Sequence, residues 1–138
     1  MASVSGIKPL RWPRLWLGLW SLAIVALIVV CLIPLDGLPP LPDNSDKVEH
    51  LTGYFVLAAA AVQLFRGRML LFAAAGLVLL GIGVEFAQGL TAYRSSDPYD
   101  ALANTIGVLL GMATTLTPWR DLLLRMEKRL PVRPSIRS

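Results

Sequence analysis

The sequence predicts an all-α, polytopic membrane protein with four transmembrane helices and a C-terminal amphipathic helix at the membrane interface. Of its 138 residues, 55% are hydrophobic and 16% are charged, whereas soluble domains are about 45–50% apolar and about 25% charged. The apolar residues form runs that approach the length of about 20 residues needed to cross a bilayer. The basic residues lie almost entirely on one side of these runs. At this length we expect one domain, covering residues 1–138.

The four apolar runs predict spans at about residues 15–34, 50–65, 69–92 and 98–117. The first run follows a basic amino end, but its apolar core is too long for a secretory signal and no small-x-small cleavage site follows. Its Cys31, the only cysteine of the chain, is expected to face lipid. The third run carries no charge from Met69 until Glu85. A proline-rich outer loop, Pro34 to Ser45, joins the first two spans, and we assign it no chemistry.

The distribution of basic residues predicts the orientation of the spans. Of the 13 lysines and arginines, only Lys47 and Arg94 fall on the side opposite to the two termini. Cytoplasmic loops carry the excess of Lys and Arg, so both termini are expected in the cytoplasm. The basic residues then face an anionic lipid leaflet, and we expect membrane lipids rather than nucleic acid as partners.

The residues after the fourth span predict a helix that lies in the interface, at about residues 118–130. One helical face is apolar and the opposite face is basic, which is typical of helices lying on a membrane surface. The apolar face consists of Trp119, Leu122, Leu123, Met126 and Leu130. From Pro131 onward we expect a polar tail.

Polar residues of three predicted spans converge on the outer end of the bundle. Glu85 lies about 9–12 Å below the outer end of its helix and Asn104 about 6 Å below Asp100, because an α-helix rises about 1.5 Å per residue. A charge facing lipid near the midplane costs about 2.5–3.5 kcal/mol or more, so the polar stripes are expected to face one another. We expect Glu85, Asp100 and Asn104 to form one cluster with Arg94, which folds over its mouth and neutralises an acid.

Each of these residues also has a purely structural interpretation. Asp97, Pro98 and Asp100 together form a favourable helix start. Gly107-x-x-x-Gly111 is typical of close helix packing. His50 alone is compatible with an interfacial residue, and Arg94 with a side chain that extends to the surface and pairs with Asp97. Glu85 fits such an account least, since an acid so deep in a span is rare and usually functional.

The combined spacing of these residues resembles the VanZ-like family. The matching pattern runs over about residues 46–111 and reads Asp46-Lys47-x-x-His50-x-x-x-Tyr54, then Glu85-x-x-Gln88, then Arg94-x-x-Asp97-x-x-Asp100-x-x-x-Asn104-x-x-Gly107-x-x-x-Gly111. The segment Gly89–Tyr93 departs from it, where members often have an aromatic residue and Pro-Gly. The resemblance implies a small multi-pass protein of the bacterial cytoplasmic membrane and a link to resistance against the glycopeptide antibiotic teicoplanin.

The first functional hypothesis is a binding site, open to the outer leaflet, for an amphiphile with a polar head. Helix amino ends favour anions, and Arg94 and Lys47 add donors for a phosphate or carboxylate. A lipid-linked cell-wall precursor or a lipoglycopeptide tail fits this chemistry. The expected ligand-binding residues are Asp46, Lys47, His50, Tyr54, Glu85, Gln88, Arg94, Asp97, Asp100 and Asn104.

The alternative is an intramembrane hydrolase or transferase acting on a lipid-linked cell-wall precursor. His50 would be the general acid or base, with Glu85 or Asp100 as its partner. No serine or cysteine stands in an obvious nucleophile setting. Proton-coupled transport with Glu85 as the carrier is a third hypothesis, which four short spans without an internal repeat disfavour.

We expect neither a cofactor nor a metal. One histidine without a nearby cysteine disfavours zinc. A metal site would use His50 with Asp46, Asp97 or Asp100, and magnesium or calcium held by carboxylates is a slightly easier variant than zinc.

Overall fold

The chain folds into an all-helical bundle. The computed structural model describes residues 6–34, 42 and 45–131, and within them no strand occurs apart from an isolated bridge between Ile7 and Phe65. Most of the predicted outer loop and the predicted tail lie outside the described residues. The elements in chain order are α1 (Pro13–Leu32), α2 (Ser45–Leu64), α3 (Gly67–Gly89), α4 (Pro98–Ala113), the 3₁₀ turns η1 (Thr114–Leu116) and η2 (Pro118–Asp121), and α5 (Leu122–Arg129).

Two helices, α1 and α3, are long and apolar enough to cross a membrane. The stretch that contains α4 and α5 would make a third if the bent pair counts as one span. α2 has 20 residues but begins with Asp46, Lys47 and Glu49, and α4 alone has only 16 residues. The all-helical prediction is therefore confirmed, with two or three candidate spans.

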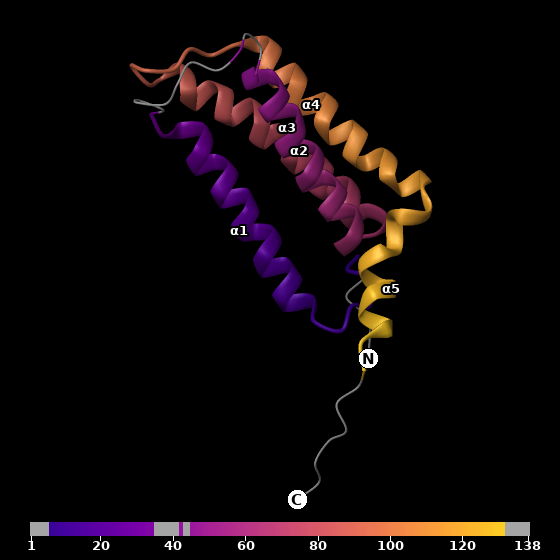
Figure 1. Cartoon of the computed structure of the whole chain (residues 1–138). Helices are drawn as coiled ribbons and strands as arrows, with labels where there is room; N and C mark the ends of the chain where they lie inside the picture. Colours follow the sequence, from indigo (N-terminus) through magenta and orange to yellow (C-terminus); the bar gives the residue numbers. More distant parts are fainter. Residues whose placement is uncertain (1–5, 35–41, 43–44, 132–138) are drawn as a thin grey trace, which may run out of the picture.

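α1 stands to one side of the other helices (Figure 1). None of its described residues is buried, and many of its apolar side chains are exposed. Trp20 connects it to the bundle: its indole Nε1–H donates to the carbonyl oxygen of Leu57 at 3.0 Å. The Trp20 ring also meets the Phe65 ring edge-on at a centroid distance of 5.3 Å. α1 is thus held against α2 by a few large side chains.

α2 and α4 pack with their backbones close together, and two glycines make this approach possible. A Cβ atom on Gly107 would overlap the carbonyl oxygen of Leu51 and lie 3.1 Å from the amide nitrogen of Phe55. A Cβ atom on Gly111 would lie 2.6 Å from the Cβ of Ala58. Gly107 and Gly111 therefore serve close helix packing, as the spacing of the two glycines in the sequence indicated.

The chain turns sharply between α4 and α5. The helical stretches Pro98–Leu116 and Pro118–Arg129 meet at 81°. The break falls at Thr117, whose backbone is extended because the residue before a proline avoids helical dihedral angles. Pro118 then starts the next turn without needing a backbone donor. This places α5 across the end of the bundle, near the amino end of α1 (Figure 1).

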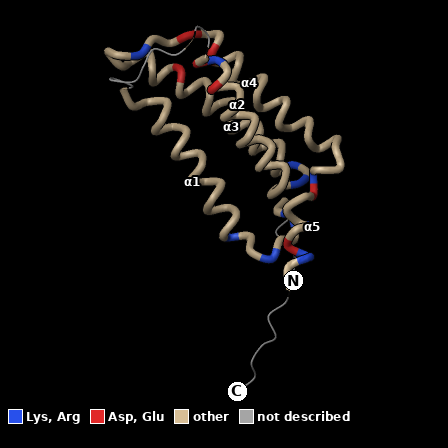
Figure 2. The backbone as a smooth tube through the Cα atoms, in the orientation of Figure 1, with Lys and Arg blue, Asp and Glu red and all other residues tan. Residues whose placement is uncertain are grey.

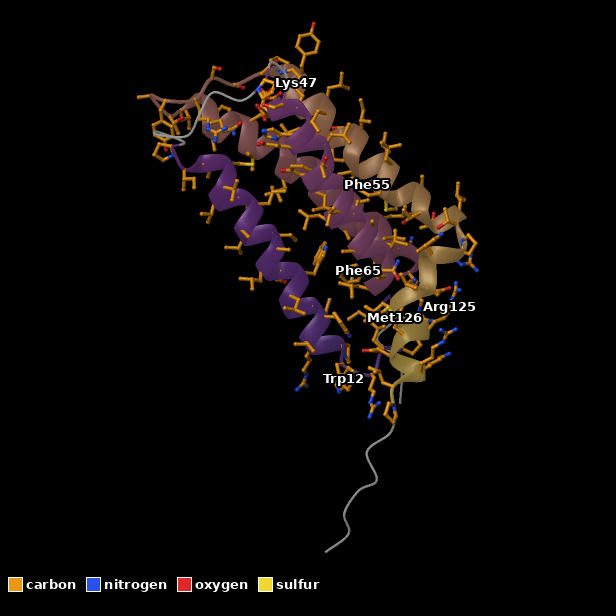
Figure 3. All side chains as sticks on the ribbon, viewed as in Figure 1. Trp12, Lys47, Phe55, Phe65, Arg125 and Met126 are labelled. Carbon is orange, nitrogen blue, oxygen red and sulfur yellow. The ribbon has the colours of Figure 1, made fainter. Side chains whose placement is uncertain are left out.

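The two ends of the bundle differ in charge. Basic residues gather at the end formed by α5 and the start of α1, whereas acidic residues predominate at the opposite end (Figure 2). Lys47 lies at that opposite end, far from Trp12, Arg125 and Met126 (Figure 3). The polar residues of the candidate site therefore collect at one end, on the first turns of α2 and α4 and the last turns of α3.

Candidate functional site

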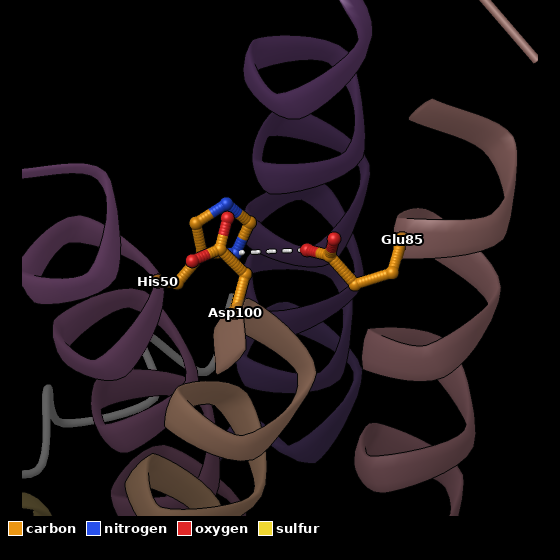
Figure 4. Close-up of side chains that lie close together, drawn as sticks. All are labelled: His50, Glu85 and Asp100. Atoms are coloured by element: carbon orange, nitrogen blue, oxygen red, sulfur yellow. Dashed lines mark ion pairs between the residues drawn. The ribbon is translucent and has the colours of Figure 1, made fainter. Parts of the chain in front are cut away.

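Three ionisable side chains from three helices meet at the acidic end of the bundle. His50 of α2, Glu85 of α3 and Asp100 of α4 point toward one another (Figure 4). One ligand atom from each lies within 4.8 Å of the others. The three residues are 7%, 4% and 6% exposed, respectively. This convergence of separate helices is the arrangement that the polar stripes predicted.

Asn104 holds the His50 ring. Its Oδ1 atom lies 3.0 Å from His50 Nδ1, and the residue is completely buried. In the tautomer with the proton on Nδ1, the ring donates this hydrogen bond and its other nitrogen is basic. Gly81 of α3 provides the space, since a Cβ atom there would lie 3.0 Å from the Cβ of Asn104. Sequence reasoning missed Gly81, because one glycine in an apolar helix carries no distinguishing signal.

Glu85 is only partly satisfied. Its Oε2 atom accepts a hydrogen bond of 3.2 Å from the backbone N–H of Asp97. Its Oε1 atom lies 3.8 Å from His50 Nδ1, which is too long for a hydrogen bond. That oxygen is buried and has no hydrogen-bond partner. A buried carboxylate oxygen without a donor is costly, so Glu85 is the unusual member of the group.

Lys47 provides the positive charge of the site. Its Nζ donates to Asp97 Oδ2 at 2.7 Å and to Asp100 Oδ1 at 2.9 Å. The other oxygen of Asp97 accepts from the backbone N–H of Tyr99 at 2.9 Å, which caps α4. The hydrogen bond from Lys47 holds the pKa of the Asp97 carboxyl below its usual range. Lys47 thus ties α2 to the first turn of α4.

The predicted position of Arg94 is wrong. Arg94 does not close over the acids: a terminal guanidinium nitrogen lies 3.5 Å from the carbonyl oxygen of Ile33. Among the described residues, no acidic side chain forms an ion pair with it. The last carbonyl groups of a helix lack partners within the helix, and those at the end of α1 attract this loop. A role of Arg94 in binding a ligand stays a prediction.

Gln88 and Tyr93 make similar contacts with the end of α1. Gln88 Nε2 donates to the carbonyl oxygen of Cys31 at 2.9 Å, and the Tyr93 hydroxyl donates to that of Leu32 at 2.8 Å. The last turn of α3 and the loop after it therefore close the carboxyl end of α1. Gln88 therefore has a structural task at the carboxyl end of α1.

The other two predicted site residues lie at the edge of the group. Asp46 is exposed and lies 3.6 Å from Lys47 Nζ. Tyr54 is fully buried one turn below His50, and its hydroxyl has no hydrogen-bond partner. The sequence suggested Asp46, Asp97 or Asp100 as carboxylates that could share a metal ion with His50. In the structure, the carboxylates grouped with His50 are those of Asp100 and Glu85, and Asp46 and Asp97 are not part of this group.

A cavity of about 680 Å³ lies beside this group, between α1 and α2. Its wall is mainly apolar and includes Ala26, Leu27 and Val30 of α1. Its lining also contains His50 and Arg94. The cavity therefore offers apolar surface next to ionisable groups, a combination suited to a molecule with an apolar tail and a polar head.

Comparison with known proteins gives little functional information. No family model matches the chain, and no solved structure matches it. A protein of the fission yeast Schizosaccharomyces pombe, named "Uncharacterized protein C11E3.10", is 32% identical over 97 residues. The match covers 67% of this chain and 59% of the yeast protein, so the chain spans about three fifths of that relative's length. The printed name of the relative states no activity.

Proposed function

We propose that this chain is a VanZ-like protein of the bacterial cytoplasmic membrane, with four spans, both termini cytoplasmic and α5 in the interface. Support comes from α1, α2, α3 and α4, which overlap the four predicted spans within a few residues. The concentration of basic residues at the α5 end agrees with that orientation (Figure 2). Trp119 of η2 and Leu122 and Met126 of α5 are 65%, 40% and 56% exposed, as an interfacial helix requires.

Within this topology, we propose that the polar site binds an amphiphilic, lipid-linked cell-envelope molecule or lipoglycopeptide from the outer leaflet, with a link to teicoplanin resistance. The cavity between α1 and α2 carries this proposal, because its apolar wall adjoins His50 and Arg94. An acyl or prenyl chain would lie along α1. A phosphate or carboxylate head would meet the guanidinium group of Arg94, whereas Asp46 and Glu49, which also line the cavity, would accept hydrogen bonds from hydroxyl or amide groups of the head.

The orientation is tested with reporter fusions. A reporter fused after Ser138 should be active on the cytoplasmic side, and one inserted at residues 38–43 should be active outside. The reverse pattern would place the polar site in the cytoplasmic leaflet and remove the argument for a cell-envelope ligand.

The binding proposal is tested by filling the cavity. Ala26→Trp puts a large ring into the lining from α1, whereas Val25→Trp places the same ring on an exposed position outside it. At equal protein level in the membrane, Ala26→Trp should weaken teicoplanin resistance and the binding of a fluorescent lipoglycopeptide, and Val25→Trp should not. Equal behaviour of the two variants would contradict this use of the cavity.

The second candidate function is an intramembrane hydrolase or transferase acting on a lipid-linked cell-wall precursor. The proximity of His50, Glu85 and Asp100 favours it, because a histidine beside a buried carboxylate is a common general acid–base pair. Water would be the attacking group in a hydrolysis. His50→Gln should then abolish the phenotype at normal protein level, whereas partial loss would indicate binding alone.

A further inference from the structure

We propose that His50, Glu85 and Asp100 bind one divalent transition-metal ion at the junction of α2, α3 and α4. This site goes beyond the proposed binding of an amphiphile and does not depend on it. It also differs from the sequence-based expectation that no metal is bound. The proposal rests on the distances between the donor atoms, on an unpartnered buried oxygen and on the local balance of charge.

The distances fit a shared ion after small side-chain movements. Two ligand atoms of one ion lie about 3–4.5 Å apart when each is about 2.0–2.3 Å from the metal. His50 Nδ1 and Glu85 Oε1 are 3.8 Å apart, and the whole set falls within 4.8 Å. The residues stand on three different helices that pack directly on one another. Such a site is supported by rigid elements rather than by a loop.

The unpartnered oxygen is an independent indication of a missing positive group. Glu85 Oε1 has no hydrogen-bond partner, and its side chain is only 5% exposed. It faces His50 and Asp100 (Figure 4). Since buried charges in proteins are paired or coordinate metals, this oxygen requires a proton or a cation. A metal ion would satisfy it together with a carboxylate oxygen of Asp100 and one ring nitrogen of His50.

Acidic side chains outnumber basic ones around the group, which favours the binding of a divalent cation. Lys47, the nearest lysine, is engaged by Asp97 and by one oxygen of Asp100, with Asp46 at 3.6 Å. Arg94 is directed to the carbonyl oxygen of Ile33 instead. Three acids, Asp46, Asp97 and Asp100, therefore surround a single lysine, and Glu85 adds another. A divalent cation would offset this excess of negative charge.

The mixed donor set indicates the class of metal. Imidazole suits zinc and related transition metals, whereas carboxylates suit manganese, magnesium and calcium. One histidine with two carboxylates favours Mn²⁺ or Zn²⁺ over Mg²⁺ or Ca²⁺. The His50 nitrogen that lies 3.8 Å from Glu85 Oε1 is Nδ1, so binding the ion through it would replace its hydrogen bond with Asn104 Oδ1.

The proposal is tested on the full chain purified in an uncharged detergent and stripped with a chelator. We expect Mn²⁺ or Zn²⁺ to bind at one ion per chain, measured by calorimetric titration and by elemental analysis after gel filtration. Binding should raise the midpoint of thermal unfolding, and Mg²⁺ and Ca²⁺ should bind at least about tenfold more weakly. This comparison between metal ions uses the wild-type protein alone.

Variants then assign the ligands. Glu85→Gln, Asp100→Asn and His50→Gln keep similar shapes, and each should lower metal affinity by at least about tenfold, since even residues that only support a metal ligand typically contribute about 10–100-fold. Glu49→Gln removes an exposed acid next to His50 and should leave the affinity unchanged. Absence of binding by all four ions at 1 mM, roughly the weakest useful affinity, would overturn the proposal. Equal affinity in wild type, Glu85→Gln and Asp100→Asn would also overturn it, and would mean that a proton neutralises the site.

Discussion

Lys47 and Asp100, which are 53 residues apart in the chain, form an ion pair of 2.9 Å that joins the first turns of α2 and α4. Asp100 is nearly buried, and the same ammonium group also meets Asp97. The pair therefore does two things: it joins two helices and it holds the carboxylates at the edge of the candidate site.

Lys47→Met is expected to destabilise the protein and disturb the site. The substitution keeps the length of the side chain but leaves Asp100 buried without its positive partner, which is more damaging than losing an exposed pair. The midpoint of thermal unfolding in detergent should fall clearly. Lys128→Met, which removes an exposed lysine from α5, is the matched control and should change it little. An equal effect of the two would show that the Lys47 pair adds nothing to stability.

Gly107→Ala should destabilise the packing of α2 against α4. The new Cβ would overlap the carbonyl oxygen of Leu51 and force the helices apart, and such overpacking costs about 1–3 kcal/mol. Gly76→Ala on α3 is the control, because a Cβ atom there meets nothing within 4 Å. Urea or thermal unfolding in detergent measures the difference. A larger loss of stability for Gly76→Ala would be incompatible with the observed packing.

Glu127→Gln should loosen the contact between α5 and the amino end of α1. Glu127 is 4% exposed and accepts hydrogen bonds from the backbone N–H of Arg11 at 2.5 Å and the indole N–H of Trp16 at 2.6 Å. The carboxylate of Glu127 on α5 thus satisfies backbone donors at the amino end of α1, where a negative charge is also favourable. Since hydrogen bonds to a charged group contribute about 1.5–3 kcal/mol, we expect a loss of about 2 kcal/mol. Lys128→Gln, its exposed neighbour, should leave stability unchanged.

The N-terminal segment should release at low pH. Lys8 Nζ lies 2.8 Å from Asp121 Oδ1, and this hydrogen bond holds the pKa of the Asp121 carboxyl below its ordinary value. A carboxyl whose pKa is lower in the folded state adds stability above its unfolded pKa of about 3.9 and loses it as pH falls further. Wild type should therefore exceed Asp121→Asn in stability at pH 6. The difference should shrink below about pH 4, and a constant difference would exclude the ion pair as its cause.

Much of the secondary structure could be predicted because its causes are local. The predicted spans at 15–34 and 69–92 became α1 at Pro13–Leu32 and α3 at Gly67–Gly89. Runs of apolar residues and the positions of prolines decide where such helices begin and end. The turn at Pro118, where the predicted interfacial segment starts, follows from the same local rule.

The convergence of the polar residues could also be predicted, but the basic side chain that pairs with them could not. Glu85, Asp100 and Asn104 share one end of the bundle because helical rise and orientation determine their depth. Arg94 was expected beside them and lies at the carboxyl end of α1 instead, while Lys47 takes its place. Both basic side chains lie at the same end of the bundle. The path of the loop after α3 determines which of the two reaches the acids.

The sequence by itself determined the helices, their apolar faces and the set of polar residues that meet at one end, since these depend on neighbours in the chain. The tertiary structure decided the contacts between distant segments: Lys47 with Asp100, Glu127 with the start of α1, and Gly81 making room for Asn104. Such contacts depend on how helices rotate and how closely they approach, and a shift of a few ångströms changes which donor reaches which acceptor.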